Sequence, residues 1–117
     1  MSGVTGTRVT SRDDVLRILR EALPALRARY GVTRLALYGS FACGQAGPES
    51  DVDLVVELAR PLGLEFVSLV YDLEERLGRK VEVTTFDSLR RNRERRRYRE
   101  IAESIERTLT DVEAAAR

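Results

Sequence analysis

Two aspartates, Asp51 and Asp53, stand one residue apart after a glycine-rich stretch that begins at Gly39-Ser40. On an extended strand, alternate side chains point to the same face, so both carboxylates would project together. Like charges held side by side repel each other, and one of them tends to keep a proton. A divalent cation relieves this conflict, because carboxylate oxygens suit Mg²⁺, which also binds substrate phosphates. The pair therefore indicates a magnesium site that faces a phosphorylated ligand.

The Gly39-Ser40 pair supplies the second half of such a site. Glycine lets backbone N–H groups approach an anion closely, and the serine hydroxyl adds a hydrogen-bond donor. Each feature alone has a simpler explanation, since glycine and serine between strands often make only a turn and an Asp-x-Asp often faces solvent. Their separation by ten residues favours a shared role in binding metal and phosphate.

A third acid, Glu82, falls in the segment 80–86, whose alternating pattern predicts a strand. Val81 and Val83 would face the core of the protein. Glu82 would then point to the opposite face, the one that carries the two aspartates. If the two strands are neighbours, three acids converge.

The elements that must position these residues can be predicted from apolar spacing. A helix starts at Ser11 and ends near Gly31, strands cover residues 35–38 and 51–57, and a second helix ends at Gly78. The apolar stripe of this second helix is Leu64, Val67, Val70, Leu73 and Leu77.

The last predicted helix is capped by Asp87 or Ser88 and carries a stripe that resumes at Tyr98. Ile105 and Leu109 fit either that helix or a short fourth strand. The run Arg90 to Arg97 contains no apolar residue, and the charged stretch Arg90–Arg99 is a candidate site for docking an acidic partner. A solvated helix face would give the same pattern.

The composition excludes several classes of chemistry. The chain contains no histidine and one cysteine, Cys43. Nucleophilic relays that use histidine and zinc sites with imidazole ligands are therefore ruled out. The segment 39–50 matches neither the P-loop nor the dinucleotide-binding glycine pattern. Cys43 cannot form an internal disulfide and is expected to be a small, half-buried side chain.

Length and charge predict one soluble domain. With 117 residues and a net charge of +1, the chain can build a single core and has no overall bias toward nucleic acid or membranes. We expect residues 1–10 to be disordered, 11–110 to form the domain and 111–117 to be frayed. The sequence has no signal-peptide pattern and no run of ~20 apolar residues, so a cytoplasmic location is expected.

Gly39-Ser40, ten further residues and then Asp51-Val52-Asp53 resemble the GSx10DxD signature of the DNA polymerase β-like nucleotidyltransferases. The order of elements over about residues 11–110 is similar to that of the minimal nucleotidyltransferases. These MntA-like antitoxins are usually paired with a HEPN-domain ribonuclease toxin. The resemblance implies an α+β fold with a small mixed sheet, helices packed on one face and the acidic site on the other.

The resemblance also implies an activity, the transfer of AMP from ATP to a tyrosine hydroxyl of the toxin, with Mg²⁺ as cofactor. Gly39 and Ser40 match the triphosphate-binding turn, Asp51 and Asp53 the metal ligands, and Glu82 the third acid. Two metal ions about 3.5 to 4 Å apart would hold the attacking and leaving oxygens. The third acid is commonly aspartate in this superfamily, so the longer Glu82 leaves its role as ligand or base open.

Two other functions remain open at this point. The protein could neutralise its partner by stoichiometric binding without catalysis, or it could transfer a nucleotide to a small molecule or an RNA end. The absence of a second domain to enclose a substrate argues against the latter. The acceptor, the preferred nucleotide and the oligomeric state are not determined by the sequence.

Overall fold

The computed structural model describes residues 8–113, apart from the side chain of Arg96. In chain order its elements are α1 (Arg12–Tyr30), β1 (Val32–Tyr38), α2 (Ser40–Cys43), β2 (Val52–Leu58), α3 (Glu65–Leu77), β3 (Val81–Thr85), α4 (Phe86–Glu94), the 3-10 helix η2 (Arg96–Tyr98), α5 (Arg99–Thr108) and β4 (Thr110–Val112). The four strands form one sheet in the order β3-β2-β1-β4.

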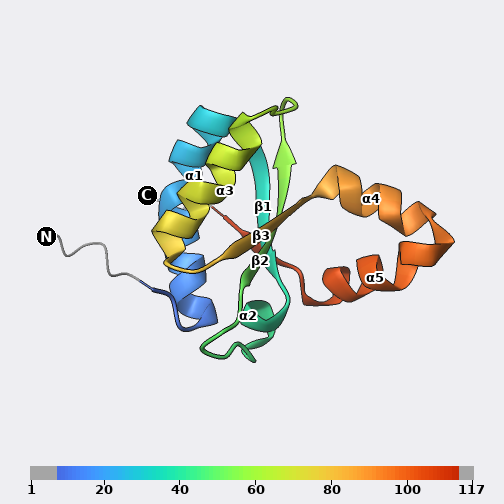
Figure 1. Ribbon diagram of the computed structural model, residues 1–117, viewed down its shortest axis with the longest axis horizontal. Coiled ribbons are helices and arrows are strands. Elements are labelled where there is room, and N and C mark those ends of the chain that lie inside the picture. The colour runs from blue at the N-terminus through green and yellow to red at the C-terminus, as the bar shows by residue number, and fades with distance from the viewer. Residues whose placement is uncertain (1–7, 114–117) are drawn as a thin grey trace, which may run out of the picture.

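The sheet is mixed. β1 runs antiparallel to both β2 and β4, whereas β2 and β3 run parallel. A parallel pair needs a crossover connection, and α3 supplies it. β2 and β3 are neighbours, as the predicted convergence of the acids requires. In Figure 1 the sheet stands between α1 and α3 on one side and α4 and α5 on the other.

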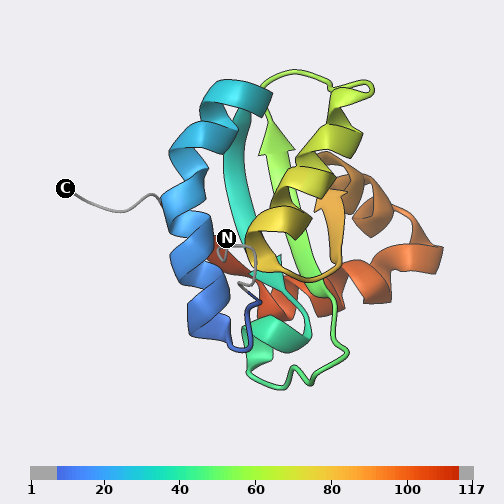
Figure 2. The ribbon, with the colours of Figure 1, turned by 60° about the vertical axis from the view of Figure 1, so that its left-hand side comes forward.

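Each face of the sheet has its own hydrophobic core. Leucines of α1 and α3 cover the first face, and Figure 2 shows both helices in front of the strands. On the second face, a smaller core joins the sheet to α4 and α5 and contains Ala36, Val55, Phe86, Leu89 and Ala102. The α+β class is confirmed. Helices lie on both faces, however, so the acidic site shares its face with α4 and α5.

Helix α1 begins where the sequence predicts. The Ser11 hydroxyl accepts a hydrogen bond from the Asp14 N–H at 3.1 Å, and Gly31 ends the helix in the left-handed conformation with φ 74°. At 19 residues α1 is the longest described helix. Within residues 8–113, no helix combines the length and apolar character that crossing a bilayer would need.

Helix α3 buries Leu73 and Leu77 of its predicted stripe, but its first turns face differently from the prediction. Its buried residues are Leu69, Leu73 and Leu77. Leu64 is 88% exposed and Val67 49% exposed, so the predicted stripe is wrong for its first turns. Leu64 precedes the helix, and the burial of Leu69 sets the rotation of the next turns. The apolar spacing alone allowed both faces.

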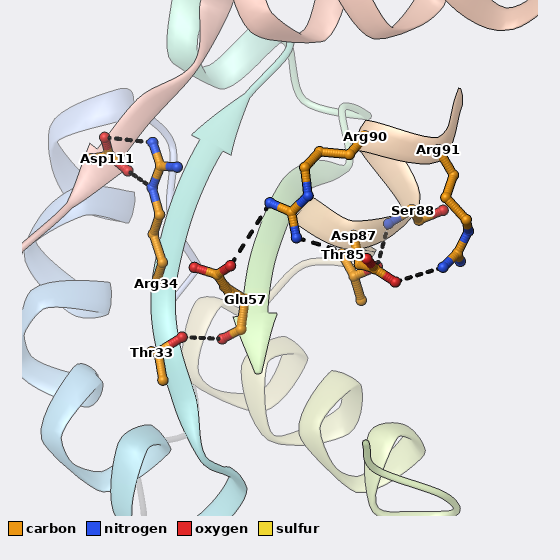
Figure 3. Close-up of polar contacts among 9 residues, drawn as sticks. All are labelled: Thr33, Arg34, Glu57, Thr85, Asp87, Ser88, Arg90, Arg91 and Asp111. Atoms are coloured by element: carbon orange, nitrogen blue, oxygen red, sulfur yellow. Dashed lines mark hydrogen bonds and ion pairs between the residues drawn. The ribbon is translucent and has the colours of Figure 1, made fainter. Parts of the chain in front are cut away.

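The C-terminal region is a helical hairpin followed by a strand. Thr85 caps α4 by accepting a hydrogen bond from the Ser88 N–H at 3.0 Å, which corrects the prediction of Asp87 or Ser88 as the cap (Figure 3). The chain becomes extended at Arg95, so α4 and α5 are separate helices. The fourth strand exists, but it begins at Thr110 rather than at Ile105.

The ends of the folded region lie further out than predicted. Val9 is buried and its N–H donates to the Leu77 carbonyl at 3.0 Å, so the ordered chain starts before residue 11. Asp111 lies in β4 and bonds the Arg34 guanidinium through both carboxylate oxygens, at 2.8 and 3.1 Å (Figure 3). Residues 1–7 and 114–117, the rest of the predicted disordered ends, lie outside the described residues.

Candidate active site

The turn after β1 is shaped by Gly39. Its backbone has φ 79° and ψ −152°, a conformation that residues with side chains rarely adopt. A Cβ atom at this position would also collide with the Oδ2 atom of Asp53. Glycine is therefore required twice, by the backbone conformation and by the carboxylate that lies against it.

Thr108 at the end of α5 holds the same turn in place. The Gly39 N–H donates to the Thr108 hydroxyl at 3.0 Å, and that hydroxyl donates to the Ile105 carbonyl at 3.2 Å. The Gly39 amide was expected to grip phosphates, but here it already has an acceptor. The Ser40 hydroxyl, in the first residue of α2, remains the donor that the turn offers. Phe41 and Ala42 bury the other side of α2 in the first core.

The acids meet across the strands. Asp53 on β2 is paired directly with Glu82 on β3, and on its other side with Tyr38 on β1. Val52 and Leu54 face the first core, so Asp53 points to the second face. Glu82 is exposed and Asp53 is half-buried. Asp51 lies just before β2 and is exposed.

The electrostatics of Asp53 reflect this crowding. Its pKa is raised from 3.8 to about 6, mainly by burial and then, in decreasing order, by the charge of Glu82, hydrogen bonding to Glu82 and the charge of Asp51. Burial also raises the pKa of Tyr38, with Asp53 and Glu82 adding to the effect. Burial and the two neighbouring acids therefore favour the protonated form of Asp53 more than water does.

The donor set fits a divalent metal ion in its chemistry. Carboxylate oxygens are the ligands that Mg²⁺ prefers, and a cation would relieve the repulsion from Glu82 and Asp51 that adds to the effect of burial on the pKa of Asp53. Among residues 8–113, however, no group of three or more Asp, Glu or Cys side chains is already gathered closely enough to hold a metal ion. The structure thus pairs Asp53 with Glu82 and brings Asp51 near, but the three carboxylates do not form a complete set of metal ligands. The assignment of metal ligands stays a prediction.

Arg79 is a buried residue that the sequence analysis missed. Its Nη1 atom donates to the carbonyls of Gly47, Pro48 and Ser50, at 3.3, 2.9 and 3.0 Å. Its Nε atom donates to the Val9 carbonyl at 2.7 Å. These bonds hold the loop that leads directly to Asp51. Nothing in the sequence separates Arg79 from the 19 other basic residues, because only burial reveals its role.

A groove of about 410 Å³ adjoins the turn. Gly39, Ser40 and Cys43 line one side, and residues of α5 line the other. Cys43 is exposed and free, which corrects the expectation of a half-buried side chain. A second hollow, of about 450 Å³, lies around Glu57 and Arg60 at the far end of β2. It contains none of the predicted site residues, so the groove beside the turn is the one relevant to the chemistry.

The fold and the signature residues agree with one protein family. The family model described as "Nucleotidyltransferase domain" matches residues 19–108. The chain belongs to this family. The match spans the turn, both aspartates and the third acid.

Two curated relatives place this nucleotidyltransferase near the MntA type. "Putative protein adenylyltransferase MJ0435" of Methanocaldococcus jannaschii is 36% identical over 77 residues, which are 65% of this chain and 82% of that protein. "Protein adenylyltransferase MntA" of Thermococcus cleftensis is 34% identical over 79 residues, 67% of this chain and 80% of that protein.

Solved structures agree with this placement. One described as a "putative minimal nucleotidyltransferase" has a TM-score of 0.64 and 29% identity, and the match covers 86% of this chain and 95% of that one. An MNT antitoxin complex with a tri-AMPylated HEPN toxin from Shewanella oneidensis gives a TM-score of 0.50 at 15% identity, covering 89% and 70%. The second likeness concerns the fold alone. Membership of the minimal nucleotidyltransferases makes this chain an enzyme of nucleotidyl transfer.

Proposed function

We propose that this nucleotidyltransferase is a Mg²⁺-dependent protein adenylyltransferase of the antitoxin type. It would transfer AMP from ATP to a tyrosine hydroxyl of a partner toxin and thereby neutralise it in the cytoplasm. The observation that carries the proposal is the pairing of Asp53 with Glu82 beside the Gly39 turn, where burial, Glu82 and Asp51 raise the pKa of Asp53. Such crowding of carboxylates suits a site that binds a cation and phosphates.

Each residue would have a defined part in the transfer. Asp51 and Asp53, with Glu82, would hold Mg²⁺, in one or two ions, which when bound supplies positive charge to the phosphates and the reacting oxygens. The Ser40 hydroxyl would donate to the β and γ phosphates. The acceptor oxygen forms a bond to the α phosphorus, the bond from that phosphorus to the bridging oxygen breaks, and pyrophosphate leaves. Glu82, which is exposed, would accept the hydroxyl proton.

The partner is proposed from the relatives. Both curated relatives are named as protein adenylyltransferases, and one solved neighbour is an MNT antitoxin bound to an AMPylated HEPN toxin. We therefore take a HEPN-domain toxin as the acceptor. The open groove supports a macromolecular acceptor, since a small domain with a shallow site does not enclose a second small substrate.

The arginine block Arg90–Arg99 is proposed to dock this partner, and the structure divides it into two groups. The first group is already paired: Arg90 lies 3.8 Å from Glu57, Arg91 bonds Asp87, and Arg93 bonds both oxygens of Glu106 at 2.9 and 3.0 Å (Figure 3 for the first two pairs).

The second group comprises Arg95, Arg97 and Arg99. These side chains are exposed and form no ion pair with a carboxylate of residues 8–113. They lie where α4 turns into α5, at the outer end of the hairpin in Figure 1. We call Arg95, Arg97 and Arg99 the tip. Its positive charges, rather than those of the whole block, would bind an acidic partner.

Transfer of label from ATP tests the proposal. The purified chain is incubated with ATP labelled at the α phosphate, Mg²⁺ and lysate of the source cells, and labelled proteins are separated. We expect label on a single protein, at a tyrosine. Asp51→Asn and Asp53→Asn should abolish the transfer with the fold intact. Glu57→Gln is a matched control, because it changes another acid of β2 on the same face and should leave transfer unchanged.

Several outcomes would reject parts of the proposal. Wild-type transfer rates in either aspartate variant would refute the metal assignment. Label on RNA or on a small metabolite would identify a different acceptor. Neutralisation of the toxin by the Asp53→Asn variant at equal protein concentrations would show that binding, rather than catalysis, protects the cell.

A further inference from the structure

We propose that the wall of the groove formed by α5 binds the nucleoside part of the donor, with Ile101 and Ile105 as its apolar contacts. The inference rests on the proposed function, because it concerns the same donor nucleotide. It assigns a binding role to α5, a helix that carries none of the signature residues.

The groove is continuous with the site already described. Tyr38, Gly39 and Ser40 form its inner end, and Gly39 lies against the Asp53 carboxylate. Phosphates held at Ser40 and near Asp53 would thus place the rest of the nucleotide within reach of the groove. The other hollow begins at Val56, beyond the acids along β2, and is lined by Glu57 to Leu62. Leu58 is five residues from Asp53, about 17 Å along a strand.

The chemistry of the α5 wall suits a base and a sugar. Ile101 is 58% exposed, and Ile105 is half-buried below it on the same side of the helix. The exposed Ser104 and Gln45 also line the groove, so polar groups flank the apolar surface. Ligand pockets typically combine apolar walls with a few polar groups that fix orientation, at volumes that include this one.

Ile101 belongs to no core of the protein. It packs in neither hydrophobic cluster, whereas Ala102 and Ile105 of the same helix join the second one. At 58% exposure, Ile101 has apolar surface that a ligand in the groove could bury. Contact with the donor would cover this surface.

Binding of two ligands separates the nucleoside contact from the phosphate contact. The affinities of ATP and of inorganic tripolyphosphate, each with Mg²⁺, are measured by calorimetry for the wild type and for Ile101→Ser. We expect ATP to bind about five- to tenfold more weakly to the variant, because serine cannot gain the free energy that the half-exposed isoleucine gains when the nucleoside buries it. Tripolyphosphate has no nucleoside, so its affinity should be unchanged. Leu64→Ser, at an exposed aliphatic residue that does not line the groove, is the control and should change neither affinity.

The single cysteine gives a second readout on the unmodified protein. Cys43 lines the groove and is exposed, so its alkylation by N-ethylmaleimide can be followed by mass spectrometry. We expect saturating ATP with Mg²⁺ to slow alkylation more than saturating tripolyphosphate does. Only ATP has a nucleoside, which would occupy the groove between α5 and Cys43.

The outcomes distinguish this inference from the function on which it rests. If tripolyphosphate and ATP bind the wild type but Ile101→Ser weakens neither, or weakens both equally, the nucleoside assignment is wrong and the phosphate site stands. Equal protection of Cys43 by the two ligands would also overturn it. If the wild type binds neither ligand, the proposed function fails, and the nucleoside assignment fails with it.

Discussion

Asp53 is the residue at which the main features of the site meet. It pairs with Glu82 and borders the Gly39 turn, and burial together with the nearby acids raises its pKa to about 6. A residue that favours its neutral form in the folded state opposes folding when it ionises. The acidic site is therefore expected to cost stability in the absence of a cation.

This cost can be measured with Asp53→Asn. The pKa of Asp53 is higher in the folded protein than its ordinary value of 3.8, so the folded state holds the proton of Asp53 more tightly than the unfolded state. The resulting contribution of Asp53 to the free energy of unfolding is complete below pH 3.8 and is lost as the pH rises through about 6. At pH 7.5 without divalent metal, we expect the variant to be more stable by about 1 kcal/mol, after allowing for solvent screening of a half-exposed group. The free energy of unfolding in urea checks this.

The sign of the pH dependence is the decisive point. The difference between variant and wild type should shrink toward zero at pH 4, where Asp53 is largely protonated. Added Mg²⁺ should stabilise the wild type and not the variant. A variant that is less stable than wild type at pH 7.5 would contradict the assigned crowding.

Thr108 gives a second prediction at the residue scale. Thr108→Val removes the acceptor of the Gly39 N–H with little change of shape, and leaves that amide without a partner. We expect the maximal rate of transfer to fall about tenfold while the protein stays folded, because the turn beside Asp53 loses its anchor. Thr108→Ser keeps the hydroxyl and should restore most of the rate. Equal rates in both variants would show that the hydroxyl has no positioning role.

At the scale of elements, α3 has two apolar faces and the structure uses one. Leu69 is fully buried, whereas Val67 and Tyr71 are 49% and 66% exposed. Leu69→Ala should lower the free energy of unfolding by about 2 to 5 kcal/mol through lost burial and a cavity. Val67→Ala should change it by less than about 0.5 kcal/mol. Comparable losses in the two variants, measured by chemical denaturation, would mean that α3 is rotated differently.

One buried side chain, Arg79, helps to hold the loop from Gly44 to Asp51 in place. Arg79→Met would remove one donor from the carbonyls of Gly47, Pro48 and Ser50, although Arg8 still donates to Pro48 and the Ser50 N–H to Gly47. We expect a loss of about 2 to 4 kcal/mol in stability and a lower rate of transfer, since this loop places Asp51. Arg76→Met, at the partly exposed partner of Asp72, is the control and should cost less than about 1 kcal/mol. An Arg79→Met variant with the stability and transfer rate of the wild type would show that the loop holds its shape without the arginine.

For the whole molecule, the distribution of charge matters more than its sum. The net charge is only +1, yet unpaired arginines collect at the tip of the α4–α5 hairpin, on the side of the sheet that carries the acids. A partner attracted to the tip would be brought toward the groove and the acidic site. Docking and chemistry would then share one side of the protein.

Binding of the toxin tests this arrangement. Arg95→Ser combined with Arg97→Ser should weaken the complex about tenfold at low salt, and the difference should shrink at 0.5 M salt, about the range where such charges are screened. Arg12→Ser with Arg20→Ser removes the same charge from α1 and should have little effect. Equal weakening by both double variants, or binding insensitive to salt, would refute docking at the tip.

The sequence by itself determined the local features. Alternation and helical spacing predicted the strands that carry Asp53 and Glu82 and the start of α1 at Ser11, because these patterns depend on neighbours along the chain. The signature from Gly39 to Asp53 predicted the family for the same reason.

Only the tertiary structure decided which of several compatible surfaces is buried. The choice between Val67 and Leu69 on α3, the burial of Arg79 under the loop and the bond from Gly39 to Thr108 all depend on residues distant in the chain. So does the hairpin of α4 and α5, which covers part of the second face of the sheet. Long-range packing sets these features, since a side chain's own sequence neighbourhood does not encode what will lie against it.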